Sequence, residues 1–107
     1  MKKGFKPHIE IRVHEYDDAI FVTGWASVRF YLKRKRHIPF LKDKSRKKWN
    51  YRKHFTIIPR DKLKKSERKE IIDIFKRELT NDIYEQFKQT VEKLRRRWDV
   101  VKIEDAI

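Results

Sequence analysis

Residues 19–33 read AIFVTGWASVRFYLK, an alternation in which almost every even-numbered side chain is apolar. The odd-numbered positions mix aromatic, hydroxyl and basic side chains. A period of two is typical of a β-strand that buries one face. Residues 8–16 (HIEIRVHEY) alternate in the same way, and Asp17-Asp18 between the two runs suits a turn. The two runs predict a β-hairpin, and Gly24 predicts a bulge or bend in its long second strand.

Residues 51–58 (YRKHFTII) are rich in aromatic and β-branched side chains and predict a third strand. Pro59 should end this strand, because proline has no N–H to donate to the sheet. A short final strand is expected at residues 99–104 (DVVKIE).

An apolar stripe with a spacing of three and four residues runs through residues 66–98, which contain neither Gly nor Pro. This spacing is the helix period. It predicts one long helix with Ser66 as its N-cap, or two nearly collinear helices that break at residues 80–82.

The predicted elements form a single α+β domain over residues 1–107. A three- or four-stranded antiparallel sheet would have a long basic connection between its second and third strands. The long C-terminal helix region would cover one face of this sheet, which leaves the opposite face open.

Residues 29–53 hold most of the positive charge of the chain, whose formal net charge is +14. They contain twelve Lys and Arg residues against one acid, Asp43, a net charge of +11. Five aromatic side chains lie among these charges. Cations interleaved with flat rings suit a polyanion whose bases can stack, which is nucleic acid.

The candidate binding residues lie on the outward row of the sheet and in a basic arm at residues 33–53. They are Arg12, Trp25, Arg29, Tyr31, Lys33, Arg34, Lys35, Arg36, Lys42, Lys44, Arg46, Lys47, Lys48, Trp49, Tyr51, Arg52 and Lys53. Phe21, His14 and Tyr16 would share the outward row. Lysines should act as point charges toward phosphates, and arginines can also stack or form paired hydrogen bonds. Trp49 and Tyr51 have two interpretations, because they can contact the partner or anchor the arm to the core.

Recognisable catalytic chemistry is absent from the sequence. There is no Cys, and two Gly residues are too few for a phosphate-binding loop. The four His residues have no metal-ligand spacing, so we expect no metal, no cofactor and no enzymatic activity. One alternative is a small nuclease that uses His14 or His54 as a base.

We therefore expect a nucleic-acid-binding protein, an accessory factor of a phage or mobile element. The second hypothesis is an interaction module, or an inhibitor of a nucleic-acid-handling enzyme, with an acidic protein partner. A small basic nuclease is the third. No run approaches the roughly 20 apolar residues that cross a bilayer, and no signal peptide is evident, so we expect a cytoplasmic protein. The open sheet face or the helix can also support a homodimer, and the sequence leaves DNA or RNA and single or double strand open.

Overall fold

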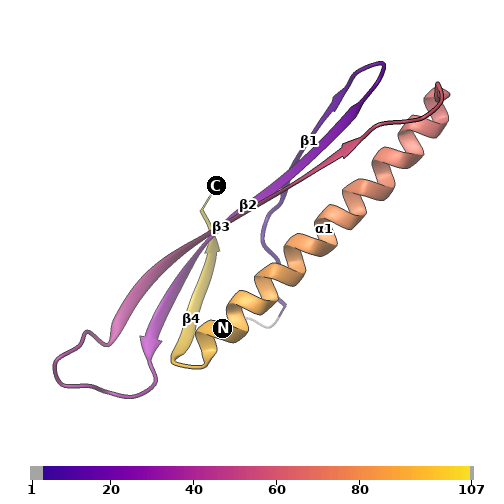
Figure 1. Ribbon diagram of the computed structural model, residues 1–107. Coiled ribbons are helices and arrows are strands. Elements are labelled where there is room, and N and C mark those ends of the chain that lie inside the picture. The colour runs from indigo at the N-terminus through magenta and orange to yellow at the C-terminus, as the bar shows by residue number, and fades with distance from the viewer. Residues whose placement is uncertain (1–3, 107) are drawn as a thin grey trace.

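The computed structural model describes residues 4–106 as an elongated four-stranded ribbon with one helix along it (Figure 1). Its principal extents are 65 × 23 × 20 Å. The elements in chain order are β1 (Glu10–Glu15), β2 (Ile20–Arg34), β3 (Lys44–Ile57), α1 (Lys65–Arg95) and β4 (Trp98–Asp105). The predicted α+β class is confirmed, and the final strand makes the sheet four-stranded.

β2 is the central strand and has neighbours on both edges. β3 pairs antiparallel with residues 20–33 along one edge. The other edge is shared, because β1 pairs with residues 20–25 and β4 pairs with residues 28–34. All the predicted apolar positions of β2 are buried, and Val28 and Phe30 are 0% exposed. The alternation in residues 19–33 thus describes the strand on which the whole sheet is built.

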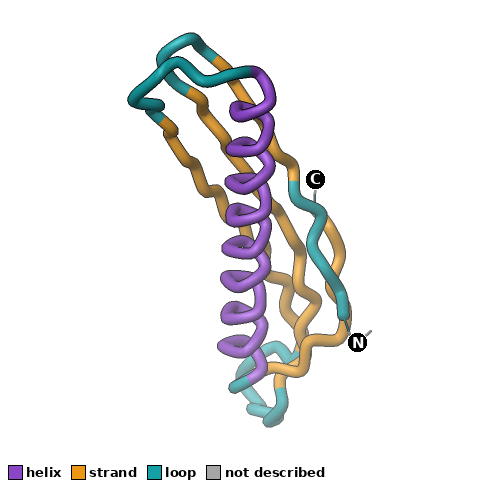
Figure 2. Tube along the Cα trace, turned by 90° about the vertical axis from the view of Figure 1, so that its right-hand side faces the viewer, coloured by secondary structure: helices purple, strands orange, loops and turns teal. Residues whose placement is uncertain are grey.

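α1 is one continuous helix of 31 residues, and it covers one face of the sheet over its full length (Figure 2). There is no break at residues 80–82, because the Thr80 hydroxyl donates to the Lys76 carbonyl at 2.8 Å instead of capping a second helix. The N-cap prediction is wrong: the helix begins at Lys65, and Ser66 lies inside its first turn. The buried stripe consists of Ile72, Leu79, Ile83, Phe87, Val91 and Leu94.

The third strand begins at Lys44, seven residues before its predicted start at Tyr51. About half of the predicted arm at residues 33–53 is therefore part of an edge strand, and residues 35–43 form the connecting loop. β2 extends to Arg34, and its backbone groups need hydrogen-bond partners along that length. β3 supplies them in spite of its charged side chains, so the connection between the second and third strands is shorter than predicted and projects from the end of a β-ribbon.

Gly24 marks a close approach between layers and not the predicted bulge. The register runs through it without a shift, since Gly24 pairs with Ile11 on one side and Lys53 on the other. A Cβ atom at this position would lie 1.8 Å from Cδ2 of Leu79, which is fully buried. The absence of a side chain therefore lets α1 approach the middle of the sheet.

Gly24→Ala should destabilise the fold by about 1–3 kcal/mol, because the new methyl group overpacks the contact with Leu79. Urea unfolding of the single variants and of Gly24→Ala/Leu79→Ala measures this. In the Leu79→Ala background the Gly24 substitution should cost little, since the space is then free. A Gly24→Ala variant that is more stable than the parent would contradict the packing argument.

Candidate functional site

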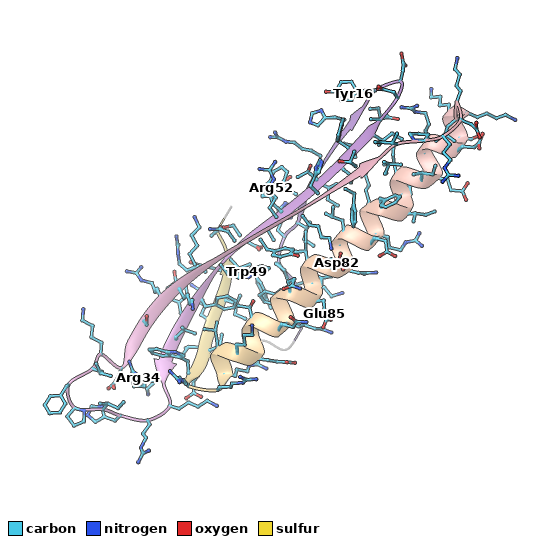
Figure 3. All side chains as sticks on the ribbon, in the orientation of Figure 1. Tyr16, Arg34, Trp49, Arg52, Asp82 and Glu85 are labelled. Carbon is cyan, nitrogen blue, oxygen red and sulfur yellow. The ribbon has the colours of Figure 1, made fainter. Side chains whose placement is uncertain are left out.

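The sheet face opposite α1 is not covered by any other element in residues 4–106. Figure 3 shows Arg52 of β3 on this side of the ribbon, whereas Asp82 lies on the helix. The strand registers define this surface, which we call the open face. It consists of Glu10, Arg12, His14, Phe21, Thr23, Trp25, Ser27, Arg29, Tyr31, Lys33, Lys44, Arg46, Lys48, Asn50, Arg52, His54, Thr56, Asp99, Lys102 and Glu104.

The predicted binding residues separate into three groups. Those on the open face are Arg12, Trp25, Arg29, Tyr31, Lys33, Lys44, Arg46, Lys48 and Arg52. Those at the end of β2 or in the following loop are Arg34, Lys35, Arg36 and Lys42. Those on the helix-covered face are Lys47, Trp49, Tyr51 and Lys53. Pairing with β2 makes this division, because alternate residues of a strand point to opposite faces.

Trp49 and Tyr51 pack toward the core. The buried side chains form two hydrophobic clusters, one that includes Phe87 and one that includes Leu79, and Trp49 packs against both. The Trp49 ring lies 5.7 Å from the Phe87 ring and stacks on Tyr51 at 6.0 Å. This packing supports the interpretation in which the two rings anchor β3. Lys53 on the same face forms an ion pair with Asp82, and their hydrogen bond raises the pKa of Lys53. These residues are therefore structural neighbours of the open face and not part of it.

A shallow pocket of about 500 Å³ lies at the middle of the open face. Trp25 forms part of its wall, and the Arg12 guanidinium lies over the Trp25 ring at 5.2 Å. Its polar lining includes the Ser27 hydroxyl, which donates to the side-chain carbonyl of Asn50. The pocket thus combines a flat ring, a cation and hydrogen-bonding groups.

A second pocket of about 620 Å³ lies near the loop and is lined in part by Tyr31, Lys33, Lys44 and Arg46. Tyr31 donates a hydrogen bond to Glu104 at 2.5 Å, and the Lys102 ammonium lies over the Tyr31 ring at 5.2 Å. This end of the open face therefore also pairs an aromatic ring with cations.

Glu104 is the carboxylate that pairs with cations on the open face. It lies 3.5 Å from Arg29 and 3.3 Å from Lys102. The hydrogen bond from Tyr31 lowers the pKa of Glu104, with a further contribution from Lys102. Glu104 consequently remains charged well below neutral pH, and it partly neutralises two of the cations beside it.

Two like-charged pairs lie directly opposite one another across β2 and β3. Lys33 faces Lys44, and Arg29 faces Lys48. Such pairs are destabilising in a sheet. Within residues 4–106, neither Lys44 nor Lys48 forms an ion pair with a carboxylate. On the other edge of β2, Asp99 lies opposite Lys33 and Glu104 lies opposite Arg29, so carboxylates offset part of this repulsion. A bound anion would relieve the remainder at Lys44 and Lys48.

The two histidines considered as catalytic bases have different surroundings, and His14 lines the pocket at Trp25 together with Arg12 and Arg52. His54 is held between Thr23, at 2.7 Å, and Thr56, at 3.0 Å. In the described part of the chain no group of three or more His, Asp or Glu side chains is arranged to hold a metal ion. Over the same residues no helix is long and apolar enough to cross a membrane.

The open-face residues that the sequence does not single out include Ser27, Asn50, Lys102 and Glu104. The alternation that was assigned to residues 51–58 extends back to Trp49, and reading it from there would have placed Asn50 on the outward row. Ser27 lies at an odd-numbered position of the alternating run at residues 19–33 but has no distinctive side chain. Lys102 becomes part of the face only through the pairing of β4 with β2.

The open face therefore presents a row of cations with two aromatic sites, one at Trp25 and one at Tyr31. An elongated anion that also offers flat apolar groups would match this arrangement. Comparisons with protein-family models, with curated proteins and with solved structures found no match for this chain.

Proposed function

We propose that this protein binds nucleic acid along the open face of its sheet. The observation that supports the proposal best is the pocket in which Trp25 lies beside Arg12 and Arg52, in line with a row of cations on β3. A base would stack on the exposed part of the Trp25 ring. Neighbouring phosphates would contact the cations of β3.

The dimensions of β3 suit a strand of nucleic acid. Its open-face cations run from Lys44 to Arg52, which at about 3.3 Å per residue is about 26 Å. This length corresponds to about eight stacked nucleotides at about 3.4 Å each. Contacts at Lys44, Arg46, Lys48 and Arg52 would therefore follow one backbone for most of a helical turn.

Protection of the sheet edge is a second explanation for the charges on β3. Lysines on an edge strand discourage pairing with another chain. That explanation accounts for charge on either face of β3. It does not require Trp25 to line a pocket, nor Arg12 of β1 to lie over its ring. Variants of Trp25 and of the β3 cations separate the two explanations, because edge protection alone predicts no binding of nucleic acid.

Binding without catalysis remains our proposal for this chain, in an accessory role such as that of a phage or mobile-element factor. An acidic protein partner would engage the same cations but would have no need of a base-sized aromatic pocket. A small nuclease is the further alternative, because His14 lines the same pocket as Arg12 and Arg52 and could act there as a base.

Affinity should fall steeply with salt. If five to eight phosphates are neutralised, log K against log salt concentration should have a slope of roughly −5 to −7 on duplex DNA. Fluorescence anisotropy on duplex and single-stranded DNA and RNA of equal length measures the slope. A slope near zero, or no binding to any of the four at low salt, would overturn the proposal.

Replacing Lys44, Arg46 and Lys48 together by Gln should make the salt slope shallower by about one unit per residue. Trp25→Ala should weaken binding by about 1–3 kcal/mol, roughly 5- to 150-fold, because one stacked base is lost, and should leave the slope unchanged. The matched control replaces three exposed lysines of α1 by Gln: Lys69, Lys88 and Lys93. An equal loss in the control would show that net charge matters and the open face does not.

Glu104→Gln should tighten binding by up to about 5-fold at low salt, because it releases Arg29 and Lys102 toward the ligand. The Gln amide oxygen can still accept the hydrogen bond from Tyr31. Glu85→Gln removes the same charge from the exposed surface of α1 and serves as the control (Figure 3). Equal gains in both variants would argue against a specific role of the open face.

A further inference from the structure

The loop between β2 and β3 ends in an exposed apolar turn. Residues 38–41 read Ile-Pro-Phe-Leu, and we call them the apolar tip. The Phe40 side chain is 94% exposed, and Leu41 is 49% exposed. The loop projects past the C-terminal end of α1 in both views (Figures 1 and 2). A phenylalanine at the end of a basic hairpin has no role in the hydrophobic core.

The apolar tip is held in a defined shape. The Leu41 N–H donates to the Ile38 carbonyl at 3.0 Å, which closes a β-turn over Pro39 and Phe40. Pro39 occupies the second position of this turn, where its restricted φ angle favours the turn before any partner binds. Phe40 is consequently presented at the corner of a preformed turn.

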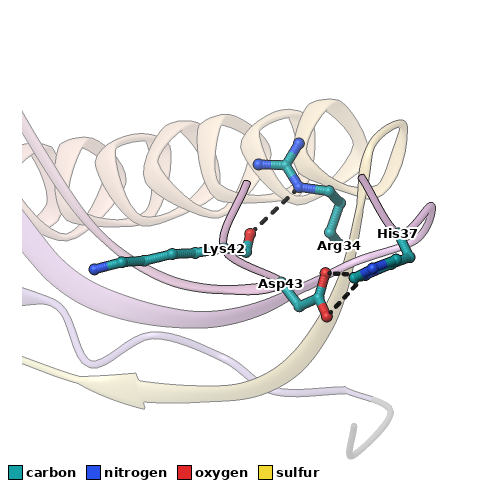
Figure 4. Close-up of polar contacts among 4 residues, drawn as sticks. All are labelled: Arg34, His37, Lys42 and Asp43. Carbon is teal, nitrogen blue, oxygen red and sulfur yellow. Dashed lines mark hydrogen bonds and ion pairs between the residues drawn. The ribbon is translucent and has the colours of Figure 1, made fainter. Parts of the chain in front are cut away.

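Polar contacts brace the base of the loop (Figure 4). His37 hydrogen-bonds Asp43 at 3.0 Å, and the Arg34 side chain donates to the Lys42 carbonyl at 3.4 Å. The Arg34 guanidinium also lies over the Trp98 ring at 4.6 Å, which ties the loop to β4. These contacts make the end of the hairpin a supported projection.

Cations surround the apolar tip. Residues 33–44 contain six Lys or Arg residues and one acid, Asp43, which is paired with His37. The partner must therefore combine dense negative charge with an apolar interior that one aromatic ring can enter. The stacked bases of a duplex, between two phosphate backbones, meet both requirements.

We propose that the apolar tip is a wedge that inserts Phe40 between two base pairs of a nucleic-acid duplex while the flanking cations hold its phosphates. The inference rests on the proposed function, because it assumes that the partner is nucleic acid. Apolar side chains inserted at a base step partly unstack it and kink the duplex. Strand β2 separates the wedge from Trp25 by eight residues up to Lys33, about 26 Å, so the two sites act on different nucleotides.

An anionic membrane surface is the rival partner for a basic tip with exposed Phe and Leu. The distribution of charge favours the duplex. Cations continue from the tip along the open face through Lys44, Arg46, Lys48 and Arg52. A flat bilayer that received the end of this ribbon would leave most of that row without contact, whereas a duplex can lie along it.

The test uses duplexes with 2-aminopurine at a central TA step in DNA or UA step in RNA, because pyrimidine–purine steps unstack most easily. One arm is DNA and the other is RNA. Saturating parent protein should raise the 2-aminopurine fluorescence several-fold in at least one arm. Phe40→Ala should abolish the rise and leave the salt slope unchanged, while Phe40→Leu should retain part of it. Ile58→Ala is the control, since Ile58 is 73% exposed and follows the far end of β3.

Each outcome decides between the proposals. Salt-dependent binding by the parent protein with no rise in fluorescence overturns the wedge and leaves the proposed function standing. An equal rise with Phe40→Ala overturns the wedge as well. No binding by the parent protein overturns both. Flotation with phosphatidylserine vesicles completes the test, because vesicle binding that depends on Phe40, without unstacking of either duplex, assigns the tip to a membrane.

Discussion

The packing of α1 across the middle of β2 is the contact on which the rest of the structure depends. Gly24 allows it, since Leu79 occupies the space where a side chain would be. Once the even-numbered positions of β2 face the helix, the odd-numbered positions must face away from it. β1, β3 and β4 all pair directly with β2, so this one choice also decides which of their side chains lie on the open face.

β3 shows how one strand can combine structure and surface chemistry. Its odd-numbered residues include Trp49, Tyr51 and Phe55, which pack on the helix-covered side and secure the strand. Its even-numbered residues include Arg46, Lys48 and Arg52, which carry charge onto the other side. The charged side chains of β3 contribute little packing, so the aromatic side chains on its other face supply the contacts with the core. The aromatic residues therefore hold the cations in a fixed row, which a flexible arm would not do.

Rigidity matters because binding costs conformational entropy. A flexible basic loop would lose freedom when it met a polyanion, whereas a paired strand has already lost it during folding. The same reasoning applies to the loop at residues 35–43, where the β-turn and the contact between His37 and Asp43 restrain the apolar tip. The fold therefore holds the cations of β3 in place against their mutual repulsion, and it keeps the apolar tip exposed to solvent.

The sequence by itself determined the α+β class, the long alternating strand, the helical region and the outward row of β2, because hydrophobic periodicity records which side of each element is buried. It also located the cations and rings between residues 29 and 53. Only the tertiary structure decided which of these share a surface. The tertiary structure also decided that the helix is continuous and that β2 has neighbours on both edges. Residues 44–50 are too highly charged to show the pattern of a strand, and only their pairing with β2 makes them one. The role of Gly24 depends on Leu79, which is 55 residues away in the chain. Lys48 and Trp49 point to opposite faces because they are adjacent in a strand, and the register with β2 decides that Trp49 is the one that faces the helix.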